Sequence, residues 1–351
     1  MGRHISVGIA ALGLAGLSGC SSVQSTLNAH GPAAHSIAEL SWFMTILFLV
    51  ITAIMWALLG FAFYRRGGTL AEHEPISAGG GEIWIAVGGI AIPLLVLSLL
   101  FVLGLSLLRA FPIHGTHGGM AGMSGHAGMT ASMKPEIRIV GHQWWWEIQY
   151  LNDDPSLQFT TANELHLPSG RPVNIEVETR DVMHSFWVPA LHGKVDLIPG
   201  RDNYIRIEAS QPGSYSGQCA EFCGAEHARM RILAVVQEPE DYQAWLAAER
   251  QPGVNPTTPD AIAGQQVFLG GPCSMCHTIR GTVAGGTVAP DLTHIGSRKM
   301  IASDSYPNND AYLEAWVTHA QSLKPGAEMP DLTQFTGEQL KDLVAYLRQL
   351  Q

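Results

Sequence analysis

The sequence predicts a multidomain protein in which a two-helix transmembrane hairpin precedes a β-sandwich and a final all-helical domain. Three observations lead to this fold class. Two uncharged stretches are long enough to span a bilayer, a series of short alternating strands follows them, and a Cys-Ser-Met-Cys-His segment lies among helix-capping signals. The composition agrees, because 46% hydrophobic and only 14% charged residues make the chain too apolar for an ordinary soluble protein.

Residues 1–20 are predicted to be a lipoprotein-type signal peptide. A basic start at Arg3 precedes an apolar stretch from Ile5 to Leu17, which is too short to span a bilayer. The following Leu17-Ser18-Gly19-Cys20 resembles a bacterial lipoprotein cleavage box, in which Cys20 would be acylated. The alternative is an uncleaved leader with an inert Cys20, and mass spectrometry of the mature N-terminus would distinguish the two.

Residues 36–110 are predicted to form the membrane hairpin. No Asp, Glu, Lys or Arg occurs between Glu39 and Arg65, or between Glu82 and Arg109. Each gap exceeds the roughly 20 apolar residues that a spanning helix needs. The sequence therefore predicts two spans joined by a short loop.

The loop is expected on the cytoplasmic side, and both ends of the chain on the outer side. Arg65 and Arg66 lie in the loop, whereas residues 21–39 contain no Lys or Arg. Pro93 interrupts the second span, which a helix tolerates when a neighbouring helix satisfies the freed backbone groups. A protein partner in the membrane is therefore implied.

Residues 111–135 are dominated by Gly, Met and His and cannot build a core. We interpret them as a flexible linker, because nothing fixes a geometry for their side chains. The alternative is a copper-gathering tract, since the segment holds many soft ligands. These are His114, His117, Met120, Met123, His126, Met129 and Met133.

Residues 136–238 are predicted to form an antiparallel β-sandwich or barrel. Short runs alternate apolar and polar residues, and Gly and Pro separate them, as in Pro168-Ser169-Gly170 and Pro199-Gly200. The predicted strands contain Ile137 and Ile139, Val173 to Val177, Tyr204 to Ile207, and Ile232 to Val236.

The segment from Cys219 to Met230 holds a set of ligands that suits copper. Thiolates, imidazole and thioether are soft donors, whereas a structural zinc site uses four thiolates or imidazoles and gains nothing from Met230. His184 ends a strand-like run and is the natural second imidazole beside His227. Cys219 and Cys223, four residues apart on a tight loop, can bridge two metal ions; the alternative is a disulfide between them.

From Gly141-His142-Gln143-Trp144 to Met230 the chain resembles the copper-binding domain of cytochrome c oxidase subunit II, which carries the binuclear centre CuA. The resemblance extends to Asp181-Val182-Met183-His184-Ser185 and to Pro199-Gly200-Arg201. It implies a cupredoxin-like Greek-key sandwich. The ligands that it implies are His184, Cys219, Cys223, His227, Met230 and the backbone carbonyl of Glu221.

The resemblance also implies roles for side chains around that centre. The Glu221 carboxylate would reach a magnesium or manganese ion shared with the catalytic subunit, since a hard cation prefers oxygen ligands. Trp144 would be the exposed ring at which electrons enter, with core packing as the alternative. Glu82 is similar to a glutamate at the mouth of a proton pathway, although a solvated carboxylate favoured by the helix dipole is the preferred interpretation. Asp181 and Asp196 are candidate supporting or docking carboxylates.

A linker is predicted over residues 239–257, and the final domain over residues 258–351. Cys273-Ser274-Met275-Cys276-His277 is a haem c attachment motif. In it, the thiols of Cys273 and Cys276 bond the haem vinyl groups and His277 ligates the iron.

Helix signals surround this motif. Thr258 followed by Pro259 predicts an N-cap with proline at the first helical position. Thr336 and Gln339 make a capping box, after which apolar residues follow at helical spacing. These residues are Leu340, Leu343, Val344 and Leu347.

This part of the chain resembles a class I cytochrome c. The loop Pro325-Gly326-Ala327-Glu328-Met329-Pro330 offers Met329 as the sixth iron ligand, and a His/Met pair raises the iron potential. His294, His319 and Met300 are the competing candidates.

Together the resemblances imply an oxidase subunit II with a fused cytochrome c, located in a bacterial inner membrane with both redox domains on the periplasmic side. Electrons would pass from cytochrome c or the fused haem c through CuA to subunit I, which reduces oxygen to water. Expected partners are subunit I, subunit III, and either cytochrome c or a quinol:cytochrome c oxidoreductase as donor. No nucleic-acid partner is expected. The alternatives are a CuA-type subunit of a nitric oxide reductase and a periplasmic copper-binding protein.

Overall fold

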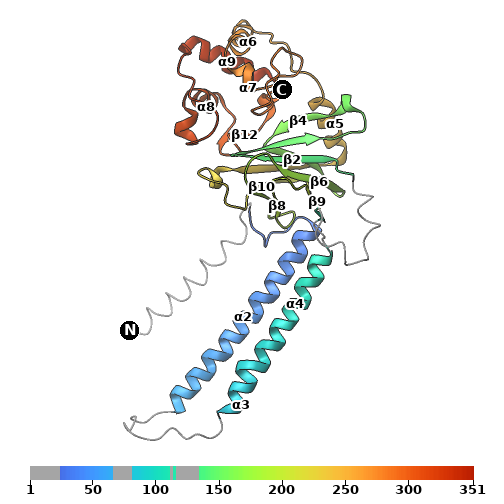
Figure 1. Cartoon of the computed structure of the whole chain (residues 1–351), viewed down its shortest axis with the longest axis vertical. Helices are drawn as coiled ribbons and strands as arrows, with labels where there is room; N and C mark the ends of the chain where they lie inside the picture. The colour runs from blue at the N-terminus through green and yellow to red at the C-terminus, as the bar shows by residue number, and fades with distance from the viewer. Residues whose placement is uncertain (1–23, 66–80, 111–113, 116–133) are drawn as a thin grey trace. The chain divides into compact units, whose positions relative to one another are not determined.

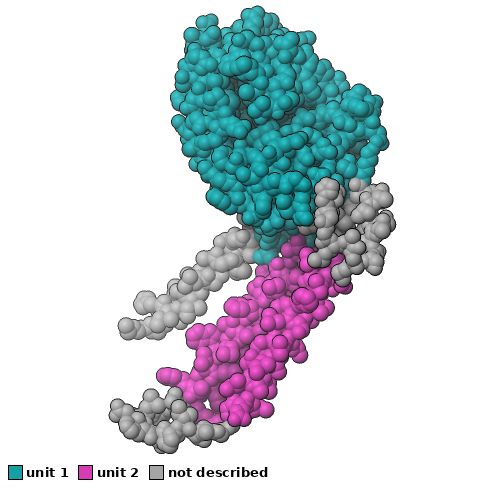
Figure 2. Space-filling model, viewed as in Figure 1, with its two compact units in different colours: residues 1–34, 113–351 teal, residues 35–112 magenta. Residues whose placement is uncertain are grey.

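A computed structural model of the chain describes residues 24–65, 81–110, 114–115 and 134–351 (Figure 1). The predicted signal peptide with Cys20, and nearly all of the predicted linker 111–135, lie outside these residues. The chain divides into two compact units, residues 1–34 with 113–351 and residues 35–112, which Figure 2 colours teal and magenta.

The smaller unit consists of the two predicted apolar helices. Helix α2 covers Pro32–Arg65, and the second span is built from α3 (Glu82–Trp84), a π-helical segment η2 (Ile85–Ala91) and α4 (Ile92–Ala110). Both spans are long and apolar enough to cross a membrane. The π-helical turns end just before Pro93, whose missing N–H breaks the regular α-helical bonding pattern. Thus Pro93 interrupts the bonding pattern while the helix continues beyond it.

The first part of the larger unit is a sandwich of two β-sheets. One sheet has the order β1 (His114–Gly115), β9 (Asn203–Glu208), β6 (Pro172–Thr179), β2 (Ile137–His142), β3 (Trp145–Tyr150) and β4 (Phe159–Ala162). The other has the order β5 (Glu164–Pro168), β11 (Arg231–Gln237), β10 (Gly213–Cys219), β7 (His184–Trp187) and β8 (Val195–Leu197). Two 3₁₀ turns lie between strands, η4 (Pro155–Leu157) and η5 (His227–Arg229).

The four strands predicted from alternation are confirmed as β2, β6, β9 and β11. The predicted antiparallel pairing holds for most strand pairs of the sandwich, but β2 pairs with β6 and β5 with β11 in parallel. Where the chain crosses from one sheet to the other and back, a strand can run in the same direction as its neighbour. The alternation of residues within one strand does not reveal the direction of the strand beside it. Inward-facing residues such as Ile139, Trp146 and Leu165 are fully buried and form one core between the sheets.

Part of the predicted linker 239–257 is in fact a helix. Helix α5 (Pro239–Glu249) packs on the sandwich, where Tyr242 and Leu246 are buried and the Trp245 ring stacks on His166 with centroids 3.9 Å apart. Pro239 at the first helical position and acidic residues in the first turn are helix-start signals that the interpretation as a domain boundary passed over.

The final domain is all-helical around one core. It contains α6 (Pro259–Gly270), α7 (Cys273–Cys276), η6 (Ile295–Ser297), a short ribbon of β12 (Met300–Ile301) and β13 (Tyr306–Pro307), α8 (Asp310–Leu323) and α9 (Gly337–Gln349). The predicted Thr258 cap and the Thr336–Gln339 capping box are confirmed. At the crossing of α6 and α9, a Cβ on Gly264 would lie only 1.9 Å from the Asp342 carbonyl oxygen, so this contact requires glycine.

The β12–β13 turn of this domain has an unusual backbone. Ala302, Ser303 and Asp304 all have positive φ, at 52°, 60° and 58°. Non-glycine residues rarely adopt this conformation even singly. Asp304 is also buried, and burial raises the pKa of its carboxyl to about 6.

Replacing Asp304 by asparagine is expected to stabilise the final domain by about 2 kcal/mol at pH 8 and by much less at pH 4, which is close to the pKa of the unfolded carboxyl. The folded carboxyl holds its proton up to about pH 6, whereas the unfolded one releases it near 3.8, so the folded state binds more protons between these values. Native stability therefore falls as pH rises through this window. Denaturant unfolding at both pH values measures the difference, and an equal gain at pH 4 would show that packing rather than charge is responsible.

Candidate functional site

One end of the sandwich gathers the predicted soft ligands. His184 begins β7 and Cys219 ends β10, and these strands are paired next to each other. Cys219 Sγ lies 3.9 Å from His184 Nδ1 and 3.7 Å from Cys223 Sγ. Cys223 Sγ lies 3.6 Å from His227 Nδ1 and 3.9 Å from Met230 Sδ. The loop after β10 and the turn η5 thus bring all five side chains together.

The two cysteines are free thiols, not the disulfide that the sequence left as an alternative. Their 3.7 Å separation is well above the length of a sulfur–sulfur bond, about 2.05 Å. Cys219 Sγ also lies 3.1 Å from the main-chain oxygen of Glu221. Donation from the Cys223 thiol lowers the pKa of Cys219, and the resulting thiolate raises the pKa of Cys223. Soft sulfur and imidazole donors around ionisable thiols fit copper.

Asp181 orients the His184 ring. Its Oδ1 lies 2.7 Å from His184 Nε2, and its Oδ2 accepts from the main-chain N–H of Gln143 at 2.6 Å. Burial opposes protonation of His184, but the hydrogen bonds to Asp181 and Cys219 outweigh it and raise the pKa of the ring. A proton on Nε2 leaves Nδ1 free toward Cys219, which is how a supporting carboxylate selects the ligating nitrogen.

Trp144 lies in the turn between β2 and β3. Because it is not on a strand, the direction of its side chain does not follow the alternation of side chains along β3. Its Nε1 donates to the Cys223 main-chain oxygen at 3.0 Å, and Gln143 Nε2 donates to the same oxygen at 2.8 Å. A Cβ on Gly224 would lie 3.0 Å from the indole ring. The φ of Gly224, 116°, also favours glycine at this position. The ring is half-buried, not exposed as the sequence suggested, because the final domain covers it.

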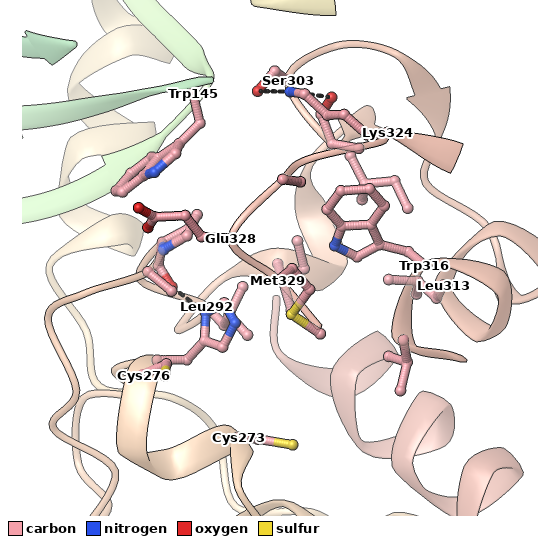
Figure 3. Close-up of a pocket in the computed structure, with 18 of the residues that line it drawn as sticks. Trp145, Cys273, Cys276, Leu292, Ser303, Leu313, Trp316, Lys324, Glu328 and Met329 are labelled. Atoms are coloured by element: carbon pink, nitrogen blue, oxygen red, sulfur yellow. Dashed lines mark hydrogen bonds between the residues drawn. The ribbon is translucent and has the colours of Figure 1, made fainter. Parts of the chain in front are cut away.

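A second site is a cavity of about 330 Å³ in the final domain (Figure 3). Cys273 and Cys276 on α7 line one side of it, and Met329 and Trp316 lie opposite them. Its wall is mainly apolar, which suits a large planar cofactor. Four lining residues come from the sandwich domain: Gln143, Trp144, Trp145 and Asn163.

His277 is prepared to ligate through one nitrogen. Its Nδ1 lies 2.7 Å from the Pro290 carbonyl oxygen, so donation there leaves Nε2 free in the cavity. Burial lowers the pKa of the ring, which keeps it neutral, as a metal ligand must be. No sequence pattern indicates the role of Pro290, because the contact joins residues thirteen positions apart across a loop.

Among the candidates for the opposite iron ligand, Met329 and Met300 both line the cavity, and His294 and His319 do not. His294 Nε2 contacts the Gln251 carbonyl oxygen at 3.1 Å, and His319 is exposed. The loop with Met329 is held by Gln321, whose Nε2 donates to the main-chain oxygens of Ala327 and Met329 at 2.6 and 2.7 Å.

Two family profiles match the chain. The profile described as "Cytochrome C oxidase subunit II, periplasmic domain" matches residues 155–237, and the profile "Cytochrome c" matches residues 261–351. The chain therefore carries a segment similar to the periplasmic domain of cytochrome c oxidase subunit II and a segment similar to cytochrome c. The first implies copper at the Cys219–Met230 site, and the second implies haem c in the cavity, which the donor atoms of each site fit.

Two relatives that share one description extend the similarity. "Cytochrome c oxidase subunit 2" of Alkalihalophilus pseudofirmus is 41% identical over 214 residues, or 61% of this chain and 60% of that protein. The protein of that name from Bacillus sp. strain PS3 is 30% identical over 226 residues, 61% of this chain and 62% of its own. The chain therefore spans about three fifths of these relatives. The solved periplasmic domain of subunit II from Bradyrhizobium japonicum is 30% identical, with a TM-score of 0.30, and covers 32% of this chain and 91% of its own.

The Glu221 carboxylate faces a lysine in this subunit II domain. Lys194 Nζ lies 3.4 Å from Glu221 Oε2 and 2.9 Å from Asp196 Oδ1, and all three side chains are partly exposed. A magnesium or manganese ion at Glu221 would have to displace the Lys194 ammonium. Glu82 is the first residue of α3 and lies in its first turn, the position that the helix dipole favours for a carboxylate.

Proposed function

We propose that the chain is the electron-transfer subunit II of a respiratory haem–copper oxidase. In this proposal it passes electrons from cytochrome c or its own haem c through a binuclear CuA centre to subunit I, where oxygen is reduced to water. The observation that carries the proposal is that one side chain, Trp144, contacts the main chain of Cys223 and also lines the cavity with Met329. The two redox sites are thus neighbours within one compact unit.

The donor arrangement supports a pair of copper ions rather than one. Cys219 and Cys223 stand at the centre, with His184 near the first sulfur and His227 near the second. Two central sulfurs, each with an imidazole beside it, are suited to bridging two copper ions. The proposed ligands are His184, Cys219, the Glu221 carbonyl, Cys223, His227 and Met230.

For the haem we propose covalent attachment through Cys273 and Cys276, with His277 and Met329 on the iron. When bound, the haem and the copper pair supply one-electron redox chemistry in which no covalent bond changes. The residues of the chain hold these ligands in place, exclude water with the apolar cavity wall, and keep the two sites close together.

The proposed partners are subunit I, subunit III, and a cytochrome c or quinol:cytochrome c oxidoreductase as donor. The proposed location is the bacterial inner membrane, with the redox domains on the periplasmic side. Arg65 lies in the last turn of α2. Because cytoplasmic loops carry an excess of Lys and Arg, this residue supports a cytoplasmic position for the loop between the two spans. The shared magnesium or manganese ion at Glu221 and the role of Glu82 remain predictions from the resemblance.

The test is to purify the membrane complex that contains the chain and to supply it with reduced cytochrome c. Oxygen uptake, together with copper and haem c in the complex, is the expected result. Nitric oxide consumption without oxygen uptake would favour a nitric oxide reductase. Copper without either activity would favour a periplasmic copper-binding protein.

Replacing Met329 by alanine is expected to lower the haem c midpoint potential by roughly 0.1 V or more, within the about 0.8 V that axial ligands span. The thioether stabilises ferrous iron, and its loss leaves water or another ligand there. Replacing Met300 by alanine is the matched control, because Met300 lines the same cavity and should leave the potential nearly unchanged. A redox titration measures both, and the reverse result would make Met300 the ligand.

A further inference from the structure

We propose that Lys324 and Ser303 form a clamp on the main-chain carbonyl of Trp144, which fixes the haem domain on the copper domain as a single electron-transfer unit. The inference rests on the proposed function and gives two residues a positioning role that the family profiles do not assign. It concerns only the larger compact unit, which contains both domains.

The clamp consists of short hydrogen bonds across the domain boundary. Lys324 Nζ donates to the Trp144 carbonyl oxygen at 2.6 Å, and Ser303 Oγ donates to the same oxygen at 2.7 Å. The two side chains also contact each other, with Nζ and Oγ 3.1 Å apart, as Figure 3 shows. Lys324 is 3% exposed and Ser303 is 1% exposed. One backbone atom of the copper domain is therefore held twice, in a place that water does not reach.

Burying the ammonium of Lys324 is costly, which indicates that it has a specific role. Its acceptors are uncharged oxygens, those of Trp144, Ser303 and, at 3.5 Å, the Ala302 main chain. Burial lowers the pKa of Lys324 to about 7. An apolar side chain of similar length would avoid this cost. The lysine instead links the segment before the Met329 loop to the other domain.

The backbone that presents Ser303 is itself strained. Ala302, Ser303 and Asp304 lie consecutively in the left-handed region. Strain of this kind persists only where surrounding contacts impose it, and it gathers at functional sites. Here the turn aims the Ser303 hydroxyl at Trp144, and two residues later Ser305 Oγ reaches the main-chain oxygen of Arg229, again on the copper domain, at 3.4 Å.

Trp144, the residue whose carbonyl the clamp holds, contacts both proposed redox sites. The Trp144 indole donates to the Cys223 main-chain oxygen, and its ring lies against Gly326, where an added Cβ would sit 3.6 Å from the ring edge. Gly326 begins the loop that carries Met329. Holding the Trp144 carbonyl therefore fixes the indole between the copper-binding loop and the Met329 loop.

Contacts away from the clamp also join the copper domain to the haem domain. Glu164 Oε1 accepts from the main-chain N–H groups of Lys299 and Met300 at 2.5 and 3.2 Å. Arg229 Nη1 donates to the Leu323 carbonyl oxygen at 2.9 Å. Because each of these contacts uses a main-chain group, the relative position of the domains is set by backbone geometry. A haem domain that swings freely between donors would not need such contacts.

The test uses the full chain with both centres loaded and the variants Lys324→Met and Ser303→Ala. Lys341→Met, on the exposed face of α9, is the matched control. Pulsed electron paramagnetic resonance measures the distance distribution between ferric haem and the copper pair, flash reduction measures the electron-transfer rate between them, and hydrogen exchange follows the amides of residues 300–305.

For Lys324→Met we expect a broadened distance distribution, exchange about tenfold faster at residues 300–305, and electron transfer slowed about tenfold, since the hydrogen bonds of Lys324 Nζ across the domain boundary are lost. Ser303→Ala should show the same changes in smaller degree, and it carries the test if Lys324→Met does not fold. Copper and haem absorption should not change. A distribution and rate equal to those of the Lys341→Met control would overturn the clamp. Failure of the proposed function would instead appear in the unsubstituted chain, as a missing copper-pair or haem signal.

Discussion

Replacing Cys223 by serine is expected to abolish binding of the copper pair while leaving haem c in place. The Cys223 sulfur lies within 4 Å of the Cys219 sulfur, the His227 ring and the Met230 thioether, so its loss removes a donor that three other members of the set contact. A serine hydroxyl is a hard donor that stays protonated at neutral pH. We expect copper content to fall from two ions per chain to near zero, measured by metal analysis and by loss of the thiolate-to-copper absorption.

The matched control is Glu221→Gln. In the proposed site Glu221 contributes only its main-chain oxygen, which lies 3.1 Å from Cys219 Sγ and survives the substitution. Copper content should therefore remain at two ions per chain. Haem absorption, unaffected in both variants, reports that the protein has folded. Two copper ions retained in Cys223→Ser would refute the bridging role of this cysteine, and copper lost from Glu221→Gln would assign the carboxylate to the centre.

The gathering of the soft side chains at one place was predictable from sequence because these residues are chemically rare and closely spaced. Cys219, Cys223, His227 and Met230 lie in one loop, so local spacing alone brings them together. His184 was harder, since it arrives from another strand, and the prediction that it ends a strand-like run was wrong. It begins β7, after bends at residues 180–182 that separate it from β6. Capping signals identified the helices that enclose the haem motif for the same reason, that their physics is local.

The supporting contacts were not predictable in the same way. Lys324 donates to the Trp144 main-chain oxygen, and the Pro290 main-chain oxygen lies against His277 Nδ1. A main-chain acceptor leaves no mark on the sequence. The half-burial of Trp144 depends on the packing of a domain more than a hundred residues later in the chain. The parallel strand pairs also depend on crossovers, which neither strand alone encodes. The sequence thus predicted the candidate ligands, whereas the contacts that hold those ligands in place became visible only in the tertiary structure.

Replacing Trp144 by leucine is expected to slow electron transfer between haem c and the copper pair by about 100-fold, the scale of a misplacement of about 1 Å in a reacting geometry. The indole donates to the Cys223 main-chain oxygen and lines the haem cavity, whereas leucine fills less of this space and cannot donate. Copper should stay bound, because Gln143 Nε2 still donates to the Cys223 main-chain oxygen. Flash reduction of the haem, followed by copper absorption, measures the rate.

Trp145→Leu is the matched control for this variant. Trp145 lines the same cavity, but its ring stacks on His142 with centroids 4.3 Å apart, and its role there is packing. It should lower the transfer rate only slightly. Trp144→Phe separates the two functions of the indole, because it keeps an aromatic ring against Gly326 and removes the donor to Cys223. A rate near that of the unsubstituted chain in Trp144→Leu would remove this residue from the electron path, whereas equal losses in Trp144→Leu and Trp145→Leu would indicate general loosening of the cavity wall.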